Sequence, residues 1–220
     1  FHFYPYCLND LYVPINRDKL SKENKSLNLV FIGSVHLKDI PRCISGEPFS
    51  EIITEIVNQK IHFHVYSPQY DIIQKSKEYE ELLKNKYFHL HIPSYDIELA
   101  KKISRCDFGF WVYYPTDVAR KEFTEDSFGN KMSTFIEAGI PYICNDELKF
   151  IKKVGEEYGV GIGLSKKQMK DIKNHLKKTN YEHFIKNIKI AREKFEINNN
   201  IDKLEKFFED VRNTKKLIRK

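Results

Sequence analysis

The chain has 220 residues, and its 41% hydrophobic and 14% aromatic content excludes a wholly disordered protein. No apolar run approaches the roughly 18 to 20 residues that a membrane-spanning helix needs. The 37 basic and 31 acidic residues give a net charge of 37 − 31 = +6, which favours an anionic partner such as a phosphate group, a nucleic acid or an anionic membrane surface. The alternative is a solvated helix surface rich in lysine and glutamate.

The cysteines indicate the cellular compartment of the protein, and the first residues indicate whether the chain is a fragment. Cys7, Cys43, Cys106 and Cys144 are far apart and form no C-x-x-C pair, which predicts reduced thiols and a cytoplasmic protein. Peripheral contact at the inner membrane face stays open. The chain opens Phe1-His2-Phe3-Tyr4, with neither an initiator methionine nor a signal peptide, so we expect a fragment that lacks an N-terminal partner domain.

Short apolar runs alternate along the chain with longer amphipathic segments, a pattern typical of parallel β/α units. In chain order the pattern predicts a strand over 27–33, a helix over 49–58, a strand over 61–66, a helix over 70–84, a strand over 87–92, a helix over 96–104, a strand over 108–112, a helix over 131–138, and strands over 142–144 and 159–164. From residue 166 onward the pattern is helical, with an interruption near 198–200.

These elements predict an α/β fold, a Rossmann-like, doubly wound parallel sheet of about six strands followed by C-terminal helices. We place an interdomain linker at 1–26, the Rossmann-like domain at 27–195 and a C-terminal helix at 196–220. Ligands of such sheets bind beyond the carboxyl ends of the strands. The rule selects four places, which follow Gly33, Ile92, Val112 and Phe128.

The segment 126–143 has the residues of an anion site. Gly129 leads into a predicted helix, whose first amide groups and positive dipole end suit a phosphate. Lys131 lies in the first turn, where a cation serves an anionic ligand and not the helix dipole. Hydroxyl groups follow at Ser133 and Thr134, before a tight turn that carries the chain into the next strand.

Two motifs in this segment resemble those of GT-B fold glycosyltransferases, in particular the C-terminal domain of the retaining family 4 enzymes and their relatives. Asp126-Ser127-Phe128-Gly129 is similar to the first half of E-x-F-G-x-x-x-x-E-A, and Gly139-Ile140-Pro141-Tyr142-Ile143 is similar to G-x-P-V-I. The resemblance covers roughly residues 27–211. It implies that Asp126 contacts the donor sugar, and that the diphosphate of a nucleotide sugar is approached by the amides of Gly129, Asn130, Lys131 and Met132.

Position 134 departs from the family pattern, because a threonine replaces the second glutamate, which usually contacts the nucleotide ribose. The Thr134 hydroxyl can bond a ribose, but without the bidentate, charge-assisted contact of a carboxylate. Lys131-Met132-Ser133 also resembles the K-x-S pattern of capsule and adhesin glycosyltransferases, in which the lysine helps to hold the nucleotide. The resemblance further implies that 27–195 binds the donor and that 196–220 packs back toward the interdomain cleft.

The ends of two other strands supply further candidates. Phe31-Ile32-Gly33-Ser34 resembles the family's first strand and glycine turn, after which basic residues usually meet the pyrophosphate. Lys38 and Arg42 are the candidates here, and the guanidinium of Arg42 suits bidentate phosphate contact. Ser94 follows the third predicted strand, where the family holds the base; its alternative role is that of a helix N-cap without a ligand.

Histidines and a tryptophan raise competing interpretations. His62 and His64 share one face of a predicted strand, and His89 and His91 share one face of the next. Four imidazoles that meet there would offer a zinc site. No carboxylate or cysteine completes the set, so hydrogen-bonded structural histidines are the favoured interpretation. Trp111 lies within a strand, which favours core packing over stacking on a base.

The sequence therefore predicts a glycosyltransferase of hexosyltransferase type in polysaccharide biosynthesis, which binds a UDP- or GDP-sugar for transfer to a carbohydrate, lipid-linked or protein acceptor. The helix start, with Lys38, Arg42 and Lys131, would stabilise the departing diphosphate. The resemblance implies that no catalytic metal is needed, in keeping with the absence of a D-x-D triplet, and we expect no other cofactor and no nucleic-acid partner. Two alternatives stay open: another GT-B enzyme, such as a nucleotide-sugar epimerase or a glycerol-phosphate polymerase, and a non-catalytic Rossmann-like binding or scaffold module.

Overall fold

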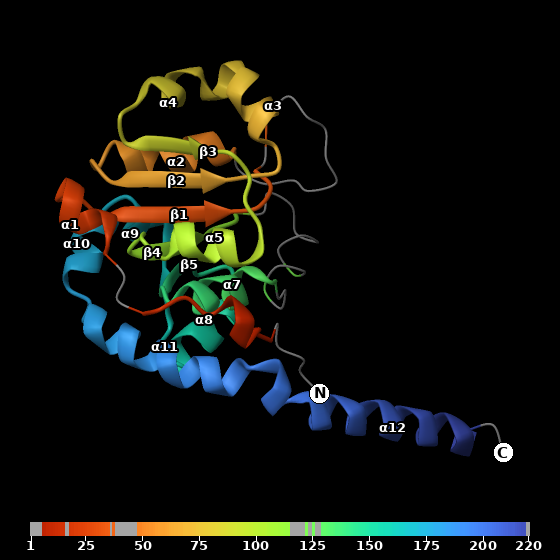
Figure 1. Ribbon diagram of the computed structural model, residues 1–220. Helices are drawn as coiled ribbons and strands as arrows, with labels where there is room; N and C mark the ends of the chain where they lie inside the picture. Colours follow the sequence, from red (N-terminus) through yellow and green to blue (C-terminus); the bar gives the residue numbers. More distant parts are fainter. Residues whose placement is uncertain are drawn as a thin grey trace.

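The computed structural model describes residues 6–15, 18–35, 37, 48–114, 122, 125 and 129–218, with side-chain burial up to residue 213. Its centre is a six-stranded sheet in which every pair of neighbouring strands is parallel. The order is β3-β2-β1-β4-β5-β6, with strands β1 (Asn28–Ile32), β2 (His62–Tyr66), β3 (Phe88–His91), β4 (Phe108–Trp111), β5 (Tyr142–Asn145) and β6 (Gly161–Leu164). The predicted fold class is confirmed (Figure 1).

Helices cover both faces of this sheet (Figure 1). One face packs against α2 (Phe49–Val57), α3 (Tyr70–Lys75), α4 (Glu80–Lys84), α9 (Lys166–Met169) and α10 (Ile172–Lys177). The other packs against α5 (Asp96–Ile103), α7 (Lys131–Ala138), α8 (Lys149–Glu157) and α11 (Tyr181–Phe195). The strands alternate accordingly: Phe63 and Val65 of β2 face the first group, and Tyr66 faces the second.

The structure departs from the predicted elements at residues 70–84 and 149–157. The single helix expected over 70–84 is broken at Ser76, whose hydroxyl accepts a hydrogen bond from the Glu78 amide and starts a 3-10 turn, η2 (Lys77–Tyr79), before α4. Helix α8 (Lys149–Glu157) was not predicted, because Gly155 lies in its interior. That glycine lies against Tyr142, whose hydroxyl oxygen would be 2.7 Å from an added Cβ, so the helix depends on a close approach to the sheet.

The N-terminal segment lies along the ends of α7 and α11. It contains the 3-10 turn η1 (Asn9–Leu11) and, further on, the short helix α1 (Leu20–Asn24). The Cys7 amide donates to the Phe195 carbonyl at 2.7 Å, and the Leu8 amide donates to the Glu137 carboxylate at 2.9 Å. Residues 6–15 are thereby fixed to the domain, and the linker role of 1–26 stays a prediction.

The chain ends in η3 (Ile197–Asn199) and α12 (Ile201–Ile218), which projects from the body of the domain (Figure 1). Phe208 and Val211 on α12 are 60% and 39% exposed. Packing of this helix toward an interdomain cleft stays a prediction.

Among the described residues, no helix combines the length and apolar character that a membrane span requires. The thiols of Cys7, Cys106 and Cys144 are free and buried, and Cys43 lies outside the described residues.

Candidate functional site

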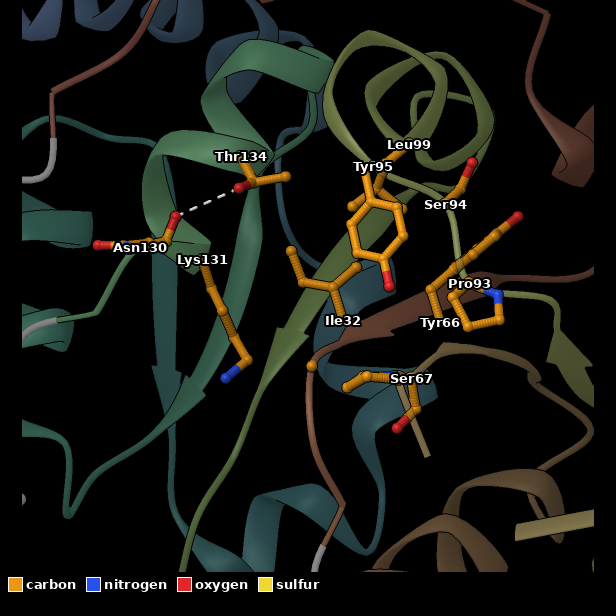
Figure 2. A pocket seen from close by; sticks show the side chains of 12 residues that line it. Ile32, Tyr66, Ser67, Pro93, Ser94, Tyr95, Leu99, Asn130, Lys131 and Thr134 are labelled. Carbon is orange, nitrogen blue, oxygen red and sulfur yellow. Dashed lines mark hydrogen bonds between the residues drawn. The ribbon is translucent and has the colours of Figure 1, made fainter. Parts of the chain in front are cut away.

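A pocket of about 330 Å³ opens at the carboxyl edge of the sheet (Figure 2). It adjoins the ends of β1 and β2 and the starts of α5 and α7, next to the point where strand order reverses between β1 and β4. Such switch points are where ligands of open α/β sheets bind. The lining consists of Ile32, Gly33, Tyr66, Ser67, Pro68, Pro93, Ser94, Tyr95, Leu99, Asn130, Lys131 and Thr134.

Gly33 ends β1 and makes room for a lysine side chain. Its φ of 112° lies where residues with a Cβ are strained, and its amide donates to the Tyr66 carbonyl at 2.9 Å. A Cβ at this position would be 3.3 Å from Cε and 3.4 Å from Nζ of Lys131. The glycine turn therefore leaves space at the pocket floor for the Lys131 ammonium.

Lys131 is the first residue of α7, and its half-buried side chain points into the pocket (Figure 2). Nζ lies 5.3 Å from the centre of the Phe31 ring and 5.7 Å from that of Trp111, both within cation–π range. Burial lowers the pKa of the Lys131 amine below its usual range. Within the described part of the chain, this ammonium has no hydrogen bond or ion pair, so all three donors remain for a ligand.

The start of α7 adds backbone donors to this cation. Its N-cap, Asn130, makes no side-chain capping bond, so the first-turn amides of α7 are left without the usual side-chain acceptor. The hydroxyls of Ser133 and Thr134 instead donate to the Asn130 carbonyl, at 2.9 and 3.3 Å. An ammonium beside uncapped amides at the positive end of a helix is an arrangement that suits phosphate.

The far end of α7 is held firmly. Gly139 ends the helix in the left-handed conformation, with φ 73°, as predicted for its C-cap. The Arg192 guanidinium donates to the carbonyls of Ile136 and Glu137, at 3.0 and 2.7 Å, and to that of Val13 at 2.7 Å. A cation at the negative end of the dipole stabilises the helix, so its N-terminus is presented to the pocket on a rigid element.

The other helix at the pocket, α5, also begins without a side-chain cap. Its N-cap is Tyr95, whose side chain makes no capping bond. The interpretation of Ser94 as the N-cap is wrong: its hydroxyl accepts a hydrogen bond from the Lys102 ammonium at 3.1 Å. Figure 2 shows this hydroxyl pointing away from the pocket, while the Tyr95 ring points into it.

Five of the predicted binding residues line this pocket together: Gly33, Ser94, Asn130, Lys131 and Thr134. Met132 and Ser133 are buried in α7 and do not line it, although their backbone belongs to the first turn. Ser34 is exposed just beyond Gly33, and Gly129 lies against Trp111, 3.0 Å from a ring carbon if it carried a Cβ. Asp126, Lys38 and Arg42 lie outside the described residues, so their roles stay predictions.

Sequence reasoning missed the side of the pocket built from β2, and of the loop after β3 it named Ser94 but not Tyr95. Tyr66 is the last residue of β2 and Ser67 and Pro68 follow it, while Tyr95 and Leu99 belong to α5 or its N-cap. The carboxyl-end rule, applied to the second predicted strand as well, would have found the first three. Trp111 packs in the core, as predicted, and its ring also contacts the lysine at the pocket floor.

The four histidines come together as a stack next to the pocket. Ring centres of His62, His89, His64, His91 and Tyr66 follow one another at 5.0, 4.5, 5.2 and 4.5 Å. Nδ1 of His64 is 2.9 Å from Nε2 of His91, and Nε2 of His64 is 3.2 Å from the Asn28 side-chain oxygen. Burial lowers the pKa of His64 to about 2 and of His91 to about 4. Among the described residues, no group of three or more His, Cys, Asp or Glu is arranged to hold a metal.

No family model and no curated protein matches the chain. Solved structures do match. HepE from Anabaena, in complex with UDP-glucose, gives a TM-score of 0.60 at 12% identity, over 92% of this chain and 55% of that one. The pneumococcal O-GlcNAc transferase GtfA, in complex with UDP and GlcNAc, gives 0.53 at 14% identity, over 90% and 40%. WaaG, a glycosyltransferase involved in lipopolysaccharide biosynthesis, gives 0.50 at 11% identity, over 87% and 51%.

These likenesses show the fold, which is that of one half of a GT-B glycosyltransferase. The predicted resemblance to the C-terminal domain of that group is confirmed at the level of fold. The chain spans about half the length of the solved structures that it matches.

Proposed function

We propose that this chain is the donor-binding half of a glycosyltransferase and that its pocket holds a nucleoside-diphosphate sugar. The observation that carries the proposal is the Lys131 ammonium, which projects into a pocket at the switch point of the sheet and has no hydrogen bond or ion pair with any described residue. A diphosphate supplies the charge and the acceptor oxygens that this ammonium and the α7 amides lack. The solved structures that contain UDP-glucose or UDP on the same fold support this choice.

In this proposal the chemistry of the domain is electrostatic. As the bond between the sugar and the diphosphate breaks, negative charge grows on the departing phosphate. The α7 amides and Lys131 would stabilise that charge, with Lys38 and Arg42 joining them. Asp126 would contact the donor sugar. The acceptor, whether carbohydrate, lipid-linked or protein, would bind in a second domain, so transfer of a hexosyl group needs both halves of the enzyme.

The test is a calorimetric titration of the chain with UDP, GDP and CDP. We expect at least one of them to bind, and Lys131→Met to weaken that binding about 10- to 100-fold, since a hydrogen bond to a charged group contributes about 1.5–3 kcal/mol. Lys153→Met is the matched control, because Lys153 is exposed on α8 and does not line the pocket. It should leave the affinity unchanged.

Two results count against the proposal. If wild type binds none of the three diphosphates, a non-catalytic Rossmann-like module becomes the better interpretation. If a diphosphate binds and both lysine variants weaken it equally, the phosphate lies elsewhere on the basic surface and the pocket is not the donor site.

A further inference from the structure

The amino edge of the sheet, where the parallel strands begin, carries a row of lysines at the opposite side from the pocket. The register pairs the first residues of β1 and β2, and β3 begins beside the second residue of β2. The turns that lead into these three strands therefore lie side by side, since neighbouring strands are about 4.8 Å apart. Each turn has an exposed lysine just before its strand, and in spatial order these are Lys86, Lys60 and Lys25.

Helix α10 extends this row along the same edge. The Lys173 amide donates to the side-chain oxygen of Gln59 at 3.5 Å, in the turn before β2. The Tyr181 hydroxyl donates to the Asp107 carbonyl at 3.1 Å, just before β4, and the chain between these contacts carries two more exposed lysines. Figure 1 shows α1 and α10 beside the ends at which the arrows of β1 and β2 begin. We call the following six residues the basic edge: Lys25, Lys60, Lys86, Lys173, Lys177 and Lys178.

The basic edge is free of carboxylates, although the whole chain has 31 acidic residues against 37 basic ones. No aspartate or glutamate occurs in the four segments that form it, which are residues 24–28, 58–62, 85–91 and 172–181. Lys84, just outside, shows the contrast, because it pairs with Glu80 and Glu81, both at 2.9 Å. Within the described part of the chain, none of the six lysines forms an ion pair. Their positive charge is thus left for a partner.

Two of these lysines have backbone conformations that favour glycine. Lys25 has a φ of 57° and Lys60 a φ of 59°, both in the left-handed region. The Ser26 hydroxyl donates to the Lys60 carbonyl at 2.5 Å and fixes the two turns to each other. Glycine or asparagine would fit these turns with less strain, so turn geometry does not account for the lysines. A cationic side chain at each turn has a use where the edge meets an anionic partner.

The composition of the basic edge favours a lipid surface as that partner. Its four segments contain no arginine, whose planar fork suits bidentate contact with a single phosphate or a base. Lysine is a flexible point charge, and several lysines along one edge suit the diffuse negative potential of a membrane that contains anionic lipids. Nucleic-acid surfaces usually add arginine or open aromatic rings to such charge.

We propose that the basic edge docks on a membrane that contains anionic lipids. This inference goes beyond the donor site and does not depend on it, because the pocket lies at the other end of the strands. A domain docked in this way turns its pocket away from the bilayer, where a ligand dissolved in water reaches it.

Co-sedimentation of the 220-residue chain with vesicles tests the proposal, with phosphatidylcholine mixed with phosphatidylglycerol in one set and phosphatidylcholine alone in the other. We expect binding to the mixed vesicles only. The binding should be lost as salt rises from about 0.1 M to about 1 M, which shortens the Debye length from about 10 Å to about 3 Å. The triple variant Lys25→Gln/Lys60→Gln/Lys86→Gln should bind about 100-fold more weakly, since each lysine near such a surface contributes about fivefold.

The matched control is Lys75→Gln/Lys153→Gln/Lys186→Gln, which removes the same charge from exposed positions on α3, α8 and α11. It should stay within about threefold of wild type, because charges beyond a Debye length from the lipid are largely screened. Both variants should match wild type in urea denaturation, since all the substituted positions are exposed.

Three results would overturn the docking proposal. The first is equal binding of the two triple variants to the mixed vesicles, which would make net charge the cause. The second is wild-type binding to phosphatidylcholine alone as tight as to the mixture. The third is a wild type that binds neither kind of vesicle, and binding to duplex DNA in that case would indicate a nucleic-acid partner. Each of these leaves the donor proposal standing, because nucleotide titration tests that site separately.

Discussion

Two lysines at opposite edges of the sheet show how a structural cation differs from a cation that serves a ligand. Lys19 is 7% exposed, and its ammonium donates to the carbonyls of Ser104 and Cys106, both at 2.8 Å, with the Tyr181 ring 5.9 Å away. Lys131 lies at the carboxyl edge against two aromatic rings, without a hydrogen bond to any described residue. Burial lowers the pKa of both, that of Lys19 to about 8.

The two lysines differ in the groups that their ammonium N–H donors contact. A buried ammonium costs desolvation free energy, which hydrogen bonds inside the protein must offset. Lys19 receives that compensation from two backbone carbonyls, so its position serves the fold. Lys131 receives it only in part, from the faces of Phe31 and Trp111, and a ligand phosphate would complete it. Predictions at Lys19 and Lys131 separate these roles, and a third, at His64, applies the same reasoning to a buried neutral base.

The largest effect is expected at Lys19. Lys19→Met leaves two buried carbonyls without their donor, which costs about 2–6 kcal/mol in the free energy of unfolding at about 1–3 kcal/mol per unsatisfied group. Urea denaturation measures this loss. Lys22→Met, at an exposed position of α1, is the control and should change stability by less than about 0.5 kcal/mol. If Lys131→Met proved the more destabilising of the two buried substitutions, the assignment of roles would have to be reversed.

A smaller effect is expected at His64, a buried base whose hydrogen bonds are also satisfied within the fold, though in its neutral form. Its pKa is about 2 in the folded protein, against a usual value of 6.5. The folded state therefore resists protonation. The stability that depends on neutral His64 is complete above pH 6.5 and is lost as the pH falls below that value, about 2 kcal/mol of it by pH 5.

Urea denaturation at pH 8 and pH 5 tests this. His64→Phe keeps a ring between His89 and His91 and should lose about 2 kcal/mol less than wild type between the two pH values. His183→Phe, at an exposed histidine of α11, should follow wild type. Equal acid sensitivity of wild type and His64→Phe would mean that His64 is not the group that resists protonation.

Much of the fold was predictable because it depends on local pattern. The helix over 131–138 begins and ends where the sequence predicted, since Gly139 supplies the left-handed C-cap. Helix α8 was missed because its interior glycine is explained only by its close approach to Tyr142 and Gly161 of the sheet. For a similar reason, only some of the residues that line the pocket were predicted. The motif pointed to Lys131, but the place of Tyr66 and Tyr95 depends on the strand order β3-β2-β1, which no local pattern reports.

The smallest effect concerns the pH dependence of nucleotide binding at Lys131. Because burial lowers the pKa of this amine and a bound phosphate would raise it, the charged form is favoured in the complex. CDP affinity should therefore be constant below the pKa of the free protein. Above that pKa it should fall up to tenfold per pH unit, until the pKa of the complex is reached.

Calorimetric titrations of wild type and Lys131→Arg with CDP, from pH 7.5 to the highest pH at which the protein stays folded, compare the two cations. The guanidinium does not titrate in this range, so the affinity of Lys131→Arg should not show the decline attributed to the amine. Any titration of CDP itself affects both proteins equally and cancels in their ratio. A ratio that stays constant with pH would show that Lys131 does not meet the phosphate, and it would remove the distinction drawn between the two lysines.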